Sequence, residues 1–220
     1  MDLTESDLVL AGLGNLQRKR IDPKILEFQQ GLLLKMGSNK HRRKFLEQLP
    51  NLPKEAIDGL MKGSWQILDK TYYARVDFGA GTSVKVIDEN TDYSIGVANM
   101  KDGMIDPKKP FVLSGLSLEY SATAPNAFAH AAIAAEINRG EFEMKYGSSE
   151  LYNKMPIAGF FTSLNNYKTD EHYAYRDINN PKVMVHDEQI TFYINIPTAF
   201  ASGTHAVGVR LHGTEVRKIS

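Results

Sequence analysis

Two clusters of positively charged residues are the first feature of this sequence that could do chemistry. Within residues 15–47, nine Lys and Arg side chains face only three Asp and Glu side chains. Cations at this density can neutralise the phosphates of a nucleic acid without reading its sequence. They could also contact a neighbouring subunit. The alternatives are that they form solvated helix faces or pair with nearby acidic residues. The candidate residues are Arg18, Lys19 and Arg20 in the first cluster, and Lys40, Arg42, Arg43 and Lys44 in the second.

A second candidate site is the stretch of residues 163–180, which we expect to be a long loop. It contains Tyr167, Tyr173 and Tyr175. Exposed tyrosines in a loop can stack on a glycan or contact a protein partner. The alternative is that these rings pack against the body of the protein.

Motifs for catalysis or metal binding are missing from the sequence. With no Cys among the 220 residues, disulfides, zinc ribbons and cysteine nucleophiles are excluded. There is no glycine-rich nucleotide-binding pattern, no His-Glu-x-x-His and no Gly-x-Ser-x-Gly. The six histidines lack the spacing of metal ligands, and residues 88–92 lack the Gly and Glu of a calcium-binding loop. We therefore expect no catalytic residue, no cofactor, no metal and no enzymatic activity.

Residues 1–70 are predicted to form a helical arm of four short helices, which would position the basic clusters. Asp22 and Pro23 mark the start of the second helix, because Asp caps a helix well and Pro suits its first turn. Apolar residues at helical spacing place the fourth helix between Pro53 and Leu68. These helices are too short to form a core alone, so we expect them to pack on the following domain or on a neighbouring subunit.

Residues 71–220 are predicted to form a separate β-rich domain. The Ala-rich run 127–138 should be an inserted helix, with a buried strand as the alternative. Gly79-Ala80-Gly81 separates the first two strands, which suggests a hairpin. The fold class is mainly β, an antiparallel β-sandwich of jelly-roll-like form, with a barrel as the alternative. The predicted strands cover residues 72–78, 82–87, 93–97, 111–122, 141–146, 151–156, 182–186, 189–196 and 205–219.

A repeated strand pattern is the basis of a resemblance to a known family. In residues 141–161 and again in residues 189–200, a strand ends in Pro and a Phe follows three or four positions later. The chain closes on a long predicted strand that contains Leu-His-Gly-Thr-Glu-Val-Arg over residues 211–217. With the helical arm, this resembles the virion coat proteins of small icosahedral, tailless bacteriophages. The resemblance implies a jelly-roll body with an N-terminal arm, and it assigns no role to any single residue.

The leading functional hypothesis is a structural, self-assembling virion protein, a capsid subunit whose basic arm contacts neighbours or the genome. Its partners would be copies of itself, other virion proteins and non-specific nucleic acid. The alternative is a β-sandwich binding module that recognises a glycan or protein through residues 163–180. An enzyme of unrecognised type is a third possibility.

Charge and hydropathy fit the leading hypothesis. Residues 1–70 hold twelve Lys and Arg against nine Asp and Glu, whereas residues 71–220 hold fourteen against seventeen. The zero net charge therefore combines a positive arm with a negative body, and the arm of one subunit could attract the body of the next. No stretch reaches the roughly 18 apolar residues that cross a bilayer, and the N-terminal residues do not resemble a secretory signal. We expect a soluble subunit with no membrane span that ends up in a virion.

Overall fold

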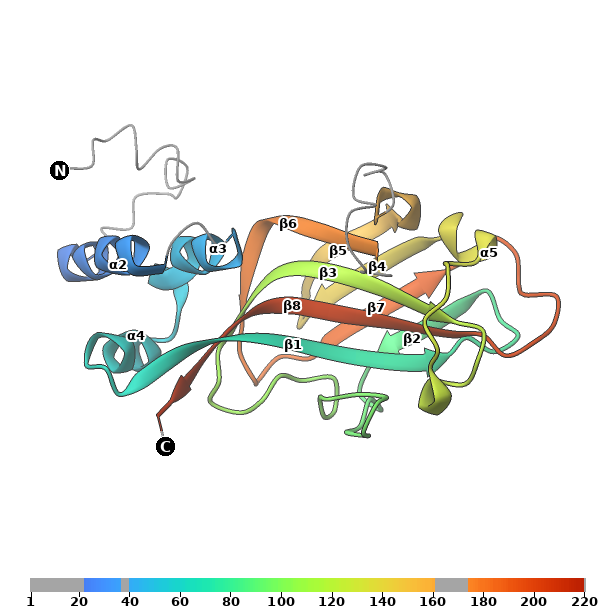
Figure 1. Cartoon of the computed structure of the whole chain (residues 1–220), viewed down its shortest axis with the longest axis horizontal. Helices are drawn as coiled ribbons and strands as arrows, with labels where there is room; N and C mark the ends of the chain where they lie inside the picture. The colour runs from blue at the N-terminus through green and yellow to red at the C-terminus, as the bar shows by residue number, and fades with distance from the viewer. Residues whose placement is uncertain (1–21, 37–39, 161–173, 220) are drawn as a thin grey trace.

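The protein is a two-sheet β-sandwich with a layer of helices on one sheet (Figure 1). The computed structural model describes residues 22–36, 40–160 and 174–219. The predicted first helix and the arginine-rich cluster at residues 18–20 lie outside the described residues. The first sheet has the order β1 (Trp65–Asp77), β8 (Ala206–Lys218), β3 (Phe111–Ser121), β6 (Ala174–Met184). The second has the order β2 (Ser83–Ile87), β7 (Ile190–Asn195), β4 (Glu141–Tyr146), β5 (Ser149–Pro156).

The strand order is that of a jelly roll. β1 pairs with β8, β2 with β7, β3 with β6 and β4 with β5, all antiparallel. Such pairing arises when one long hairpin is rolled up, so that its two arms alternate between two sheets. The predicted antiparallel, jelly-roll-like sandwich is therefore confirmed.

Alternating apolar residues build the core between the sheets. In β4 and β7, buried residues alternate with partly exposed ones, as expected for strands with one face toward the core. Aromatic rings from different elements fill the centre, with Phe142 stacked on Phe192 at 5.5 Å and Phe160 edge-on to Phe142 at 5.1 Å. Phe160 follows Pro156 at the end of β5, so the Phe after the strand-ending Pro does fold back onto the core.

The helices cover the outer face of the first sheet at one end. They are α2 (Pro23–Met36), α3 (Lys40–Gln48) and α4 (Lys54–Met61), with a 3-10 turn at Leu49–Asn51. Phe45, Leu46 and Leu49 are buried in a second apolar cluster that includes Val112 of β3 and Val216 of β8. The helices therefore bury their apolar faces against the chain's own sheet.

The predicted β1–β2 hairpin is wrong, because the two strands lie in different sheets. Gly79 has φ +65°, and the backbone of Phe78 donates to the carbonyl of His205 at 2.7 Å. These contacts turn the chain from the first sheet to the second, so the glycine-rich segment links two layers. Spacing along the sequence does not distinguish such a link from a hairpin turn.

The fourth helix ends at Met61, so its predicted extension to Leu68 is wrong. Gly63 has φ +69°, which ends the helix, and β1 begins at Trp65. The Trp65 indole packs directly on Gly59, where an added Cβ would lie 2.0 Å from the ring. The apolar spacing continues past the helix only because Trp65 folds back onto it.

Two other predicted elements are only partly present. Residues 93–97 form no strand and contribute only an isolated bridge from Ser94 to Ala98. The inserted helix is reduced to α5 (Ala135–Asn138), preceded by a 3-10 turn at Pro125–Ala127. The segment between them is pinned to the sheet, since Ala131 donates to the carbonyl of Tyr120 at 3.0 Å. A continuous helix there would lose this contact.

Replacing Gly213 of β8 by Ala should strongly destabilise the protein. A Cβ at this position would lie 2.1 Å from the Val112 carbonyl oxygen and 2.5 Å from the Phe111 ring. We expect Gly213→Ala to lower the free energy of unfolding by about 3 kcal/mol, since backbone and packed ring would both have to move. Urea denaturation measures this loss.

The matched control is Gly31→Ala in α2, where an added Cβ meets nothing within 4 Å. This change should leave stability unchanged or raise it by up to about 1 kcal/mol, because Ala favours helix. Equal unfolding midpoints for the two variants would contradict the packing described for Gly213.

Candidate interaction surfaces

The residues of the second basic cluster differ in burial: Lys44 is buried, whereas Arg43 is exposed. Lys44 points into the protein, where only 8% of the residue is exposed. Its ammonium group donates to the carbonyl of Ser114 at 3.1 Å and forms an ion pair with Asp177 of β6. Lys44 thus ties α3 to β3 and β6. The prediction that Lys44 contacts a phosphate or a neighbouring subunit is wrong, because a buried, ion-paired ammonium is not available to either. Its pairing with Asp177 agrees with the alternative of an acidic partner.

The other cations of this cluster differ in their surroundings. Arg43 is exposed, whereas Arg42 lies 3.8 Å from the carboxylate of Asp69 on β1. The side chain of Lys40 lies outside the part of the structure that is described. Of the second cluster, Arg43 therefore presents an accessible charge on α3.

The predicted recognition loop is partly a strand. Residues 174–180 belong to β6, so the loop prediction is wrong for this part, while Tyr167 and Tyr173 lie outside the described residues. Tyr175 lies on the outer face of the first sheet, edge-on to His212 at 5.5 Å. It occupies the space over Gly115, where an added Cβ would lie 2.2 Å from its hydroxyl. Tyr175 therefore packs along the sheet, as the alternative interpretation allowed, but 36% of the residue stays exposed, so its predicted role in recognition stays a prediction.

Polar side chains continue across this outer face. Ser117 Oγ lies 2.7 Å from His212 Nε2, and Thr71 Oγ1 lies 3.4 Å from His212 Nδ1. His212 therefore connects β1, β3 and β8 through both ring nitrogens. Sequence reasoning missed this group, because its members lie 46 to 141 positions apart and each is a common residue type.

Two arginines neutralise a buried glutamate on the same face. Arg75 donates to Glu119 at 2.7 Å, and Arg210 forms an ion pair with the other carboxylate oxygen. Gly208 stands between Arg75 and Glu119 in the sheet, and a Cβ there would lie 2.9 Å from Arg75 Cγ. The missing side chain leaves room for the pair to meet across β8.

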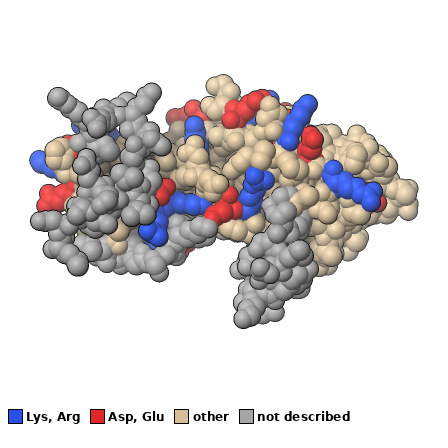
Figure 2. Space-filling view, turned by 90° about the horizontal axis from the view of Figure 1, so that it is seen from above, with Lys and Arg blue, Asp and Glu red and all other residues tan. Residues whose placement is uncertain are grey.

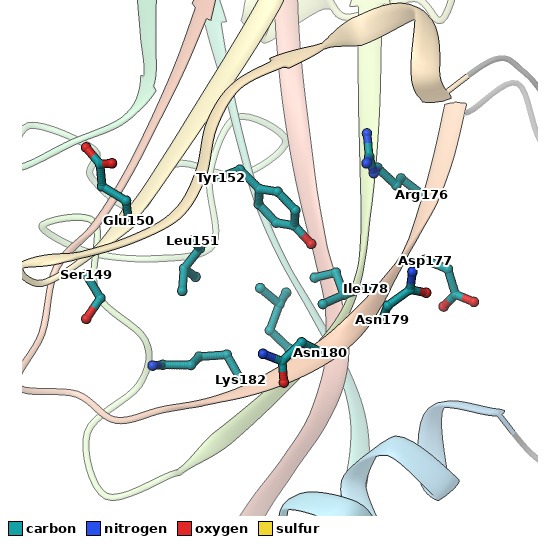
Figure 3. A pocket seen from close by; sticks show the side chains of 11 residues that line it. Ser149, Glu150, Leu151, Tyr152, Arg176, Asp177, Ile178, Asn179, Asn180 and Lys182 are labelled. Atoms are coloured by element: carbon teal, nitrogen blue, oxygen red, sulfur yellow. The ribbon is translucent and has the colours of Figure 1, made fainter. Parts of the chain in front are cut away.

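A pocket of about 410 Å³ opens between the edge strands β5 and β6. Tyr152 reaches from β5 toward β6, while Asn180 and Lys182 reach from β6 toward β5 (Figure 3). The Arg176 guanidinium lies 5.9 Å from the Tyr152 ring. Burial raises the pKa of the Tyr152 hydroxyl, and the positive charge of Arg176 partly opposes this shift. The pocket thus offers an aromatic ring beside amides and charges of both signs.

A loop between β2 and β3 holds two exposed apolar side chains. Tyr93 is 67% exposed and Ile95 is 88% exposed. The loop backbone is fixed to β1, because Arg75 donates to the Val97 carbonyl at 2.9 Å and Asn99 donates to the Tyr73 carbonyl at 3.2 Å. Ile95 is therefore held out into solvent by a structured loop.

Charges on the side of the molecule seen from above are mixed. Figure 2 shows Lys and Arg side chains next to Asp and Glu side chains over the described part of this face. In the described ranges, no group of three or more His, Asp or Glu side chains is arranged to hold a metal ion. No described helix combines the length and apolar character needed to cross a membrane.

Lys44→Met tests the structural role of this buried ammonium. We expect the free energy of unfolding to fall by about 2–3 kcal/mol, because the Asp177 carboxylate would lose its ammonium partner in a largely buried place. The neighbouring control Arg43→Met removes an exposed charge and should change stability by less than about 0.5 kcal/mol. Chemical denaturation of both variants decides the matter, and an unchanged Lys44→Met protein would refute the buried pairing.

Comparison with models of protein families gives no match to this chain, and comparison with curated proteins gives none either.

Proposed function

We propose that this chain is a structural, self-assembling subunit of a virion shell. The observation that carries the proposal is the structured loop with Tyr93 and Ile95, which exposes apolar surface that the subunit's own fold does not bury. Burying a side chain of this size stabilises a contact by about 1.5–3 kcal/mol. A second chain that covered the loop would gain this free energy without any rearrangement of the loop.

A second apolar area lies at the helical end of the molecule. Met61 of α4 is 39% exposed and Ile219 is 52% exposed, and the Ile219 backbone donates to the carbonyl of Ser64 just after α4 at 2.9 Å. The two exposed apolar areas therefore lie on different parts of the subunit. Two unlike patches favour head-to-tail contacts, which close into rings or shells when the rotation between neighbours allows it.

The jelly-roll body suits this role. Two packed sheets give a rigid block, and the helical layer shares an apolar cluster with the first sheet, so loops and helices keep fixed positions. The resemblance to virion coat proteins supports the same function. In this proposal the chain acts as a building block and not as an enzyme, it is free before assembly, and it resides in the virion afterwards.

The β5–β6 pocket supports a second candidate function, a binding module for a glycan. Residues 176–180, which line one side of it, fall within the 163–180 segment predicted for recognition. An aromatic ring beside amides and charged groups is a suitable surface for stacking on a sugar and bonding its hydroxyls.

The double variant Tyr93→Ser/Ile95→Lys should stop assembly without unfolding the subunit. We expect wild type to form large particles as protein concentration rises, and the variant to stay monomeric, because a charge replaces the apolar contact. Sedimentation velocity, negative-stain imaging and circular dichroism give assembly state and fold together. Ala80→Lys, which adds a charge at another exposed loop position, is the control and should assemble. A wild type that is monomeric at every concentration and salt would rule out the proposed function.

Arg176→Ala tests the second candidate function. If the pocket binds sugars, this change should weaken binding by about tenfold or more, as expected for a lost charge-assisted hydrogen bond. Thermal-shift and calorimetric titrations with a panel of neutral oligosaccharides measure the effect. Lys154→Ala, on β5 outside the pocket, should bind like wild type. A wild type that binds no member of the panel would exclude a glycan-binding module.

A further inference from the structure

A small pocket at the helical end of the sandwich is lined almost entirely by cations. It has a volume of about 330 Å³, and its walls are Pro107, Lys108, Lys109, Arg217 and Lys218. We call this the cationic pocket. Its residues come from the segment before β3 and from the end of β8, which run close together near the C-terminal end of the chain (Figure 1).

Hydrogen bonds hold the two walls of the cationic pocket together. Val216 donates to the carbonyl of Pro110 at 2.9 Å. Tyr72 donates its hydroxyl proton to Glu215 at 2.9 Å and accepts from the backbone of Asp106 at 3.1 Å. Burial raises the pKa of the Tyr72 hydroxyl, so it keeps this proton at neutral pH. The pocket is therefore formed before any ligand arrives.

Most of the positive charge in the pocket is not neutralised. The carboxylate of Asp106 lies 3.0 Å from Lys109 and 3.7 Å from Lys70, so it neutralises part of the positive charge on one wall of the pocket. Lys108, Arg217 and Lys218 form no ion pair with residues in the described ranges, and all three are exposed. Repulsion among these cations makes the pocket favourable for a negatively charged group.

The loop of residues 88–95 has the complementary chemistry. It contains three carboxylates and no Lys or Arg. Glu89 and Asp92 are exposed beside Tyr93 and Ile95, and Lys85 lies 3.9 Å from the Glu89 carboxylate. The cationic pocket likewise adjoins an apolar side chain, since the half-exposed Ile219 follows Lys218. Each surface therefore combines one sign of charge with exposed apolar area, and the signs are opposite.

We propose that the 88–95 loop of one copy of this chain docks on the cationic pocket of a second copy. This inference rests on the self-assembly proposed above and names the contact that drives it. Glu89 and Asp92 approach the lysines and Arg217, while Tyr93 and Ile95 cover the apolar area around Ile219. Because the two surfaces lie on different parts of the subunit, every copy can donate one loop and accept another.

Charge reversal on either side should block assembly. Lys108→Glu/Arg217→Glu/Lys218→Glu makes the pocket acidic, and Glu89→Lys/Asp92→Lys makes the loop basic. Either set places like charges together and should raise the protein concentration needed for half-assembly by about tenfold or more. The control Lys24→Glu/Lys101→Glu/Lys154→Glu changes net charge as much as the pocket set does at three other exposed sites, and should assemble like wild type.

The deciding variant carries both reversals in one chain. Its acidic pocket meets a basic loop, so assembly should return, as measured by sedimentation velocity at several salt concentrations with circular dichroism as the check on folding. If wild type assembles but the combined variant does not, or if either single set assembles normally, the docking proposal fails while the proposed function stands. A wild type that stays monomeric would contradict both the docking proposal and the proposed function.

A nucleic acid is the competing occupant of the cationic pocket, and the same variants separate the two. We expect the pocket set to bind a fluorescent 20-nucleotide oligo(dT) within about twofold of the matched charge control, since general electrostatic attraction depends mainly on net charge. If the pocket set loses oligo(dT) binding relative to this control but assembles normally, the pocket serves nucleic acid and the docking proposal is overturned.

Discussion

Burial of β3 on both faces is the constraint on which the rest of the structure depends. Ser114, Ser117 and Glu119 are polar residues of this strand, yet every residue of the strand lies away from water. An unsatisfied polar group in such a place costs about 1–3 kcal/mol. Ser114 and Ser117 bond to His212, and Glu119 meets two arginines. These partners come from β8 and from β1 beyond it, so satisfying β3 fixes the register of these three strands.

Much of the fold could be predicted from the sequence, because alternation and turn residues mark strands locally. Residues 141–146 were predicted as a strand and are one, since Phe142 and Met144 face the core between outward polar residues. Alternation does not determine which strands pair with each other. The link at Gly79 joins two sheets, and residues 93–97 alternate without a partner strand. The predicted hairpin and the predicted strand 93–97 are therefore wrong because strand pairing cannot be predicted from alternation.

The candidate site was harder to predict than the fold. Lys44 lies in the densest basic cluster, yet it is buried in an ion pair with Asp177, which lies 133 positions away in the sequence. Conversely, the cations of the pocket at Lys108 and Arg217 come from a short turn and a strand end, and neither segment has an unusual charge count. Local charge density therefore identified a structural residue and missed an accessible surface, because the three-dimensional neighbours decide which charges reach solvent.

The pairing of β1 with β8 also sets an order of events during synthesis. β1 pairs along its whole length with a strand whose residues follow more than 120 positions later, so the first sheet cannot close until β8 has left the ribosome. Arg217 and Lys218 stand at the end of that strand, opposite Gln66 and Trp65. A chain that lacks β8 also lacks Arg217 and Lys218, so under the proposed docking only chains that have completed this strand would add to a growing assembly.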